Sequence, residues 1–260
     1  MPRPEVPLRE RLIFALDLPS PAEAQRWVER LEPQVGFFKV GLELFVAGGL
    51  PVVDWIVGRG HKVMLDLKFH DIPATVGRAV RLLTGHGITF ATVHGRDGVV
   101  EAAVAARGDR GDRSDSGALG ILAVTVLTST PNYRLNSKGE AVTEGRLEDL
   151  VLSRAGLAVS KGCSGVVCSG REAPMLRREL GEGFVIVTPG IRPAAGGDDQ
   201  VRVTTAGQAI ANGADHVVVG RPIRDAQDPL AVAVAMQEEI RAVVGGGRRV
   251  LPDNGPGRWA

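Results

Sequence analysis

The feature that most constrains the fold is an alternation of short apolar runs with helix-like segments, repeated eight times along 260 residues. Continuous apolar runs are typical of parallel strands that are covered on both faces. Eight strand–helix units in a chain of this length predict a (β/α)8 barrel, that is, a TIM barrel. A doubly wound open sheet is the alternative, because the pattern does not show whether the sheet closes. No GxGxxG motif follows the first strand, which disfavours a dinucleotide-binding fold. The expected strands lie at residues 11–17, 36–41, 62–68, 88–95, 118–128, 164–170, 183–190 and 215–220.

One barrel accounts for the whole chain, so we expect a single domain over residues 1–260. Residues 245–260, rich in glycine, proline and arginine, are expected to form a weakly ordered C-terminal extension of it. Three other stretches, residues 107–117, 129–144 and 190–200, are polar and rich in turn residues, and are expected to be loops.

Charge and composition exclude several classes of protein. The formal net charge is +1, from 31 basic and 30 acidic residues, so there is no general surplus of basic residues for binding nucleic acid. No apolar run approaches the roughly 18 residues of a membrane span, and no signal peptide is evident. The two cysteines lack a CxxC spacing and are expected to be buried and reduced. We therefore expect a cytoplasmic protein without nucleic-acid or membrane partners.

Charged residues stand at the ends of three consecutive expected strands. Side chains alternate across a strand, so Asp66 and Lys68 of the third strand should share the inward face. The same alternation turns Asp17 and Lys39 inward at the ends of the first two strands. Barrel enzymes hold their chemistry at this carboxyl end, and a lysine kept between carboxylates stays protonated and can donate a proton. The pattern predicts an active site, with a purely structural ion-pair network as the alternative.

Two glycine–arginine motifs follow the seventh and eighth strands, where many barrels bind phosphate. Gly190 and Gly220 would let backbone N–H groups approach the anion, and Arg192 and Arg221 would supply charge and forked donors. Turn glycines beside solvated arginines are the alternative. None of the histidines forms an HExxH or comparable cluster, so we expect no metal.

Seven short motifs, in order along nearly the whole chain, resemble the orotidine 5′-phosphate decarboxylase family, whose enzymes make UMP. The DxKxxD core also occurs in related barrels such as hexulose-phosphate synthase and ketogulonate-phosphate decarboxylase. The longer form with HDIP, together with Lys39 and the two arginine motifs, is more specific. The motifs are ALDLPS, FKVG, DLKFHDIPATV, TVHG, VLTS, TPGIR and VVVGRPI.

The resemblance implies decarboxylation of orotidine 5′-phosphate to UMP and CO2, without a metal or an organic cofactor. It places Asp17 and Lys39 at the ribose hydroxyls and Asp66 beside the substrate carboxylate. Lys68 would protonate C6, the pyrimidine carbon left when CO2 departs. The catalytic candidates are Lys68, Asp66, Asp71 and Lys39.

The resemblance also implies binding roles for residues outside this cluster. Thr128 would hydrogen-bond the base, and Gln200 would close over phosphate and base. In the family the residues matching Asp71 and Thr75 reach into the neighbouring subunit's site, which implies a homodimer. Ile72, next to Asp71, is also expected to contact substrate. The implied phosphate ligands are Arg192, Gly220 and Arg221.

Two other functions stay open. A Mg²⁺-dependent aldolase or decarboxylase of the same barrel superfamily would act on a sugar phosphate, using an acidic residue at the end of the second strand. Lys39 occupies that place here and would repel a cation. A catalytically silent phosphate-binding barrel is the second alternative, and the presence of both Asp66 and Lys68 argues against it.

Overall fold

Eight parallel strands form a closed ring in the computed structural model, which describes residues 5–108, 119–126, 134–135, 141–142, 144–193 and 204–246. The strands pair in the order β1-β10-β9-β8-β5-β4-β3-β2, and β1 pairs with both β2 and β10. This closure confirms the predicted barrel and excludes the open sheet. The barrel strands are β1 (Leu12–Leu16), β2 (Phe37–Gly41), β3 (Lys62–Phe69), β4 (Phe90–His94), β5 (Gly120–Val124), β8 (Gly165–Val167), β9 (Val185–Thr188) and β10 (His216–Val219).

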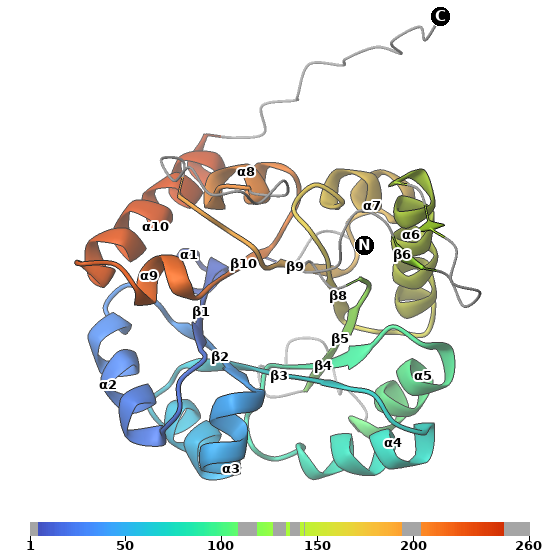
Figure 1. The fold of residues 1–260 in the computed structure, drawn as a ribbon, viewed down its shortest axis with the longest axis horizontal. Helices are drawn as coiled ribbons and strands as arrows, with labels where there is room; N and C mark the ends of the chain where they lie inside the picture. The colour runs from blue at the N-terminus through green and yellow to red at the C-terminus, as the bar shows by residue number, and fades with distance from the viewer. Residues whose placement is uncertain are drawn as a thin grey trace, which may run out of the picture.

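Helices surround the ring of strands, as Figure 1 shows. Several begin with the caps that the sequence contains: the Ser20 hydroxyl accepts a hydrogen bond from the Glu23 N–H, and Thr205 and Gln208 form a capping box. The helices are α1 (Leu8–Arg11), α2 (Pro21–Leu31), α3 (Leu42–Gly58), α4 (Pro73–Leu82), α5 (Asp97–Ala106), α6 (Glu144–Ser160), α7 (Ala173–Leu180), α8 (Ala206–Ala211), α9 (Arg221–Arg224) and α10 (Pro229–Gly245).

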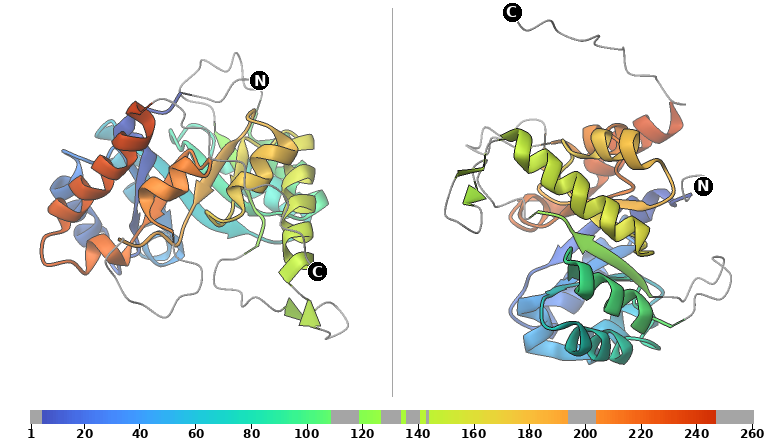
Figure 2. Two further views of the ribbon diagram at one scale, coloured as in Figure 1. Left: turned by 90° about the horizontal axis from the view of Figure 1, so that it is seen from above. Right: turned by 90° about the vertical axis from the view of Figure 1, so that its right-hand side faces the viewer.

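The structure departs from the expected elements in a few places. Helix α3 starts directly after β2, whereas the helix-like pattern in the sequence begins only at Leu50, and the helix bends at Gly49, which has a φ of 57°. The short helices α1 and α9 were not predicted. Part of the expected loop 129–144 forms a hairpin of β6 (Arg134–Leu135) and β7 (Ala141–Val142), which projects beyond the start of α6 (Figure 2). Most of the other expected loops and of the C-terminal extension lies outside the described residues.

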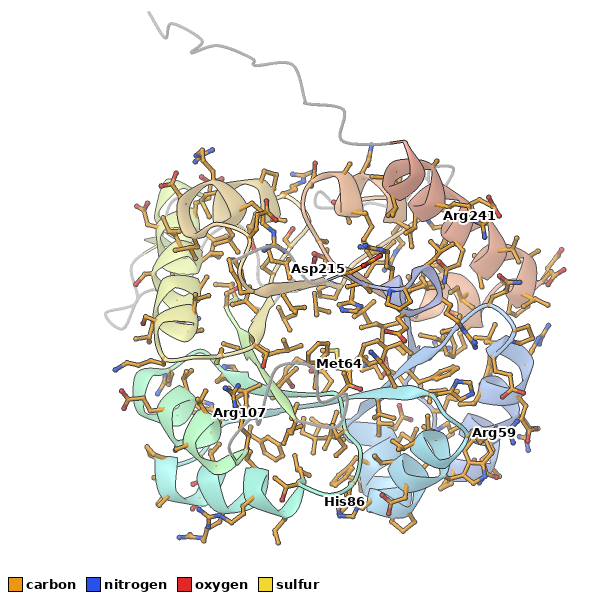
Figure 3. The ribbon with its side chains drawn as sticks, turned by 180° about the vertical axis from the view of Figure 1, so that it is seen from behind. Arg59, Met64, His86, Arg107, Asp215 and Arg241 are labelled. Carbon is orange, nitrogen blue, oxygen red and sulfur yellow. The ribbon has the colours of Figure 1, made fainter. Side chains whose placement is uncertain are left out.

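Two apolar layers follow from the alternation of side chains along the strands. Outward residues such as Phe14, Phe38 and Leu65 pack under the helices. The inward residues fill the barrel, and Met64 lies at its centre, whereas Arg59 and His86 lie out at the surrounding helices (Figure 3). The interior layer consists of Ile13, Ala15, Phe37, Met64, Phe90, Leu122, Val124, Val167, Val187 and Val218.

The amino end of the barrel is closed by aromatic rings. The His216 ring lies edge-on to Phe37 and Phe90, with centroids 5.4 and 5.8 Å away, and its Nδ1 lies 2.8 Å from the Glu10 carbonyl oxygen. Burial lowers the pKa of His216 to about 4, so the ring is neutral at pH 7 and donates its proton to that carbonyl.

Acidification should therefore destabilise the fold through His216. Its folded-state pKa lies below the ordinary 6.5, so the unfolded chain takes up the proton first as the pH falls. The contribution of neutral His216 to the free energy of unfolding is complete above pH 6.5 and is lost as the pH falls toward 4. The total loss is about 3 kcal/mol. Urea unfolding between these pH values should show a shallower pH dependence for His216→Gln than for the wild type. Equal slopes would contradict the assignment.

Cys163 and Cys168 are buried and free, as predicted; burial raises the pKa of Cys163 to about 12 and also raises the pKa of Cys168. Both thiols are therefore poor nucleophiles. In the described ranges, no helix has the length and apolar character needed to cross a membrane.

Candidate active site

Four charged side chains meet at the carboxyl ends of β1, β2 and β3. They form a row of alternating sign, Asp17, Lys39, Asp66 and Lys68, here called the charge row. The Lys39 Nζ lies 2.7 Å from Asp17 Oδ1 and 3.7 Å from Asp66 Oδ2. The Lys68 Nζ lies 2.8 Å from the same Asp66 oxygen. The structure thus brings together the four inward charges that strand alternation predicts.

Asp66 is the central anion of the charge row. Burial raises the pKa of its carboxyl group, but the ammonium groups of Lys39 and Lys68 outweigh burial and hold that pKa below its ordinary value. Hydrogen bonds from Lys68 and Thr92 act in the same direction. Asp66 is therefore ionised at neutral pH. The Lys68 side chain is 35% exposed, against 10% for Lys39, so Lys68 presents the more accessible ammonium.

The backbone of β3 is irregular where Lys68 stands. Leu65 pairs with Ala91 of β4 and Phe69 pairs with Val93, so three residues of β3 face one of β4. Lys68 has a φ of 49°, in the left-handed region that non-glycine residues rarely adopt. Despite this bulge, Lys68 lies beside Asp66 on the inward side that strand alternation predicts.

A cavity of about 130 Å³ opens over the charge row. One side is charged, with Lys39, Asp66 and Lys68. The other side is apolar and comes from β5, β8, β9, β10 and the segments that follow them. Such a cavity suits a small, partly apolar ligand that meets charged groups at one edge. Its other lining residues are Met64, Val124, Val126, Val167, Pro189 and Val218.

The expected phosphate ligands stand at the same end of the barrel. Gly220 lies against β1, since a Cβ there would come within 3.4 Å of the Ala15 Cβ and 3.9 Å of Asp17 Oδ2. Arg221 opens α9 and is exposed. The Arg192 guanidinium donates to the carbonyl oxygen of Ile191, and its backbone N–H donates to Thr204. No hydrogen bond or ion pair joins either arginine to the charge row within the described residues.

Other predicted residues lie apart from the cavity. Asp71 is exposed and accepts a hydrogen bond from the Ile72 N–H at 2.6 Å. Thr75, in the first turn of α4, accepts a bond from Arg78 at 3.3 Å. The resemblance assigns three residues of this segment to the site, but none of them lines the cavity: Asp71, Ile72 and Thr75. Thr128 and Gln200 lie outside the described residues.

The site has one polar member that was not predicted from the sequence. Thr92 is fully buried on β4, and its hydroxyl donates to Asp66 Oδ1 at 2.9 Å. The strand alternation could have identified it, because Thr92 is two residues after the inward Phe90. Next along that face is His94, whose ring lies 4.5 Å from that of His70. Burial and the nearby His70 lower the pKa of His94.

The described part of the chain contains no group of three His, Cys, Asp or Glu side chains that could hold a metal ion. The position at the end of β2 that a cation would share with Asp66 is taken by the Lys39 ammonium. The charge row therefore suits an anionic ligand better than a divalent cation.

Comparisons with known proteins agree on one family. The sequence profile of the Orotidine 5′-phosphate decarboxylase / HUMPS family matches residues 10–236. The chain is 50% identical over 245 residues to the orotidine 5′-phosphate decarboxylase of Methylococcus capsulatus, which covers 93% of this chain and 96% of that protein. It is 48% identical over 233 residues to the enzyme of that name from Rhodopseudomonas palustris strain BisB5, covering 89% and 95%.

A solved structure supports the same relationship. The crystal structure of orotidine 5′-phosphate decarboxylase from Lactobacillus acidophilus superimposes with a TM-score of 0.74 at 36% identity, covering 90% of this chain and 100% of that one. An uncharacterized conserved protein from Geobacillus kaustophilus gives a TM-score of 0.71 at 33% identity. Sequence and fold therefore place the chain with the same set of barrel proteins.

Proposed function

Because the chain belongs to the Orotidine 5′-phosphate decarboxylase / HUMPS family, we propose that Lys68 donates the proton that completes decarboxylation of orotidine 5′-phosphate. The chain is a carboxy-lyase that converts this nucleotide to UMP and CO2 in pyrimidine synthesis. The bond between C6 and the carboxylate breaks, and its electron pair stays on C6. That carbon then takes a proton from the Lys68 ammonium, and the neutral amine regains a proton from water.

The observation that carries the proposal is the 2.8 Å pair of Lys68 and Asp66 at the edge of the cavity. Without a cofactor to accept the electron pair, the carbanion needs a fixed positive charge nearby. Lys68 supplies that charge, and Asp66 holds the ammonium in place before substrate arrives. Donors that are oriented in advance lose little energy to reorganisation when charge develops.

Asp66 has a second effect in this proposal. Its carboxylate is ionised and would lie beside the carboxylate of the bound substrate. Two adjacent negative charges raise the energy of bound substrate, and the repulsion disappears as CO2 leaves. The apolar side of the cavity would hold the pyrimidine ring, with C6 facing the charge row.

The rest of the nucleotide would be held by groups farther along the barrel mouth. Asp17 and Lys39, 2.7 Å apart, would bind the ribose hydroxyls. Arg192, Gly220 and Arg221 would bind the 5′-phosphate, at the position where barrels often bind phosphate. Binding energy from this distant phosphate can be used to position C6 against Lys68.

The two residues outside the described ranges keep the roles that the resemblance implies. Thr128 would hydrogen-bond the base, and Gln200 would close over phosphate and base.

We also propose that the chain acts as a homodimer in which Asp71 and Thr75 complete the neighbouring subunit's site, with Ile72 beside them. Three large apolar side chains support a contact surface at this end of the barrel: Leu42, Val46 and Ile72 are 61%, 84% and 65% exposed. They lie at the starts of α3 and α4, directly after β2 and β3. Exposed apolar side chains that gather at one end of a molecule often mark a protein interface.

The Mg²⁺-dependent sugar-phosphate reaction is the second candidate, because the matching family profile also covers HUMPS. The Lys39 ammonium, 3.7 Å from Asp66, disfavours a metal ion in this position. The two relatives described above, at 50% and 48% identity, carry the decarboxylase name alone.

One assay separates the two candidates. Purified protein, incubated with orotidine 5′-phosphate in excess EDTA, should remove the orotate absorbance at the rate seen without chelator. Mass spectrometry should identify UMP as the product. Strict dependence on added Mg²⁺, or no loss of absorbance at all, would overturn the proposal.

A further inference from the structure

The hydroxyl of Thr92 connects the two residues that the proposed chemistry uses most. Its Oγ1 accepts a hydrogen bond from the backbone N–H of Lys68 at 2.9 Å and donates one to Asp66 Oδ1 at 2.9 Å. A hydroxyl has one proton to donate. Because Asp66 is ionised and can only accept, and the N–H of Lys68 can only donate, both bonds have a fixed direction.

The first of these bonds stabilises the unusual backbone at Lys68. In a regular parallel pair, backbone N–H groups of β3 donate to carbonyl groups of β4. The bulge between Leu65 and Phe69 interrupts that ladder and leaves Lys68 in the left-handed region. The Thr92 side chain supplies the acceptor for the Lys68 N–H, so this partly buried donor is satisfied where the ladder is broken.

The second bond fixes the rotation of the Asp66 carboxylate. Oδ1 faces Thr92, and so Oδ2 faces the ammonium groups of Lys68 and Lys39, at 2.8 and 3.7 Å. Without the hydroxyl the carboxylate could turn about its terminal bond. Lys68 would then have neither a fixed backbone nor a fixed partner.

We propose that Thr92 is a positioning residue, whose single hydroxyl sets the Lys68 backbone and the Asp66 carboxylate in the geometry needed for proton transfer to C6. The inference rests on the proposed function. Thr92 does not line the cavity and is fully buried, so it acts through its two neighbours and not on the nucleotide.

The test compares kcat and KM for decarboxylation in variants that differ at this hydroxyl. Thr92→Val keeps the shape but removes both bonds, and should lower kcat by about tenfold to a hundredfold with little change in KM. Thr92→Ser keeps the hydroxyl and should retain most of the wild-type kcat. A low kcat in Thr92→Val together with a nearly normal kcat in Thr92→Ser is a result that a simple packing role of Thr92 would not produce.

A matched control is available directly after the neighbouring strand, β5. Thr125 is also buried, and its hydroxyl donates to the Val167 carbonyl at 3.0 Å, away from the charge row. Thr125→Val removes a buried hydroxyl bond of similar kind and should leave kcat near the wild-type value. Melting temperatures of both Val variants show whether the fold is affected equally.

Each outcome decides between defined alternatives. If Thr92→Val does not fold, Thr92→Ser can be compared with Thr92→Ala. Both variants lack the methyl group of threonine, and they differ only in the hydroxyl. A kcat of Thr92→Val within about twofold of wild type, or equal losses in Ser and Ala, would overturn the inference while the wild-type enzyme stays active. An inactive wild-type protein would instead overturn the proposed function.

Discussion

Replacement of Lys68 by alanine should lower kcat for decarboxylation by about 10³-fold or more, because it removes the proposed proton donor, which is also the cation proposed to face the carbanion. Nucleotide binding should persist, since Lys39, Asp17 and the proposed phosphate ligands are untouched. The measurement is single-turnover loss of orotate absorbance, together with the UMP dissociation constant by calorimetry. A large fall in kcat with an unchanged dissociation constant would place Lys68 in the chemical step.

The matched control for this variant lies on the same strand. Lys62 is at the opposite end of β3. Its Nζ lies 2.8 Å from Glu10 Oε2, and its side chain is 41% exposed. Lys62→Ala removes an equal charge from the same strand but far from the cavity, and should leave kcat unchanged. Near-normal turnover in Lys68→Ala, or an equal loss in Lys62→Ala, would remove Lys68 from its proposed role.

The charge row could be predicted from sequence because it depends on local geometry. Alternation along a strand turns Asp17, Lys39 and Asp66 inward whatever the rest of the chain does. The bulge at Lys68 could not be predicted in this way. It depends on how β3 pairs with β4 and on the buried hydroxyl of Thr92, and both are contacts between strands far apart in sequence.

The closure of the barrel and the exact bounds of its helices could not be predicted from the local sequence pattern either. The eight strands were identified by their apolar runs, but only the pairing of β1 with β10 shows that the sheet closes. The first turns of α3 escaped the pattern because a glycine pair and Pro51 interrupt the helical sequence, and the structure accommodates them with a bend at Gly49. The roles of Asp71 and Thr75 came from the family resemblance, whereas the phosphate site was already predicted from the glycine–arginine motifs that follow the seventh and eighth strands.

Mixing two inactive variants should restore activity if the sites are shared between subunits. In a dimer of one Lys68→Ala chain and one Asp71→Asn chain, one site would contain both substitutions and the other would contain neither. Random reassembly makes half of the dimers mixed, and half of the sites in these are intact, so about a quarter of wild-type activity should return. The measurement is decarboxylation after joint refolding of equal amounts of the two variants.

A second mixture provides the control that makes this result specific. Lys68 and Asp66 lie 2.8 Å apart in one chain, so substitutions at these two residues must disable the site of the chain that carries them. Mixing Lys68→Ala with Asp66→Asn leaves one defect in each site and should restore nothing. If Asp71 belongs instead to the site of its own chain, both mixtures stay inactive even when mixed dimers are verified by mass spectrometry. The exposed position of Asp71, which makes no ion pair with Lys39 or Lys68 in the described chain, favours the shared arrangement.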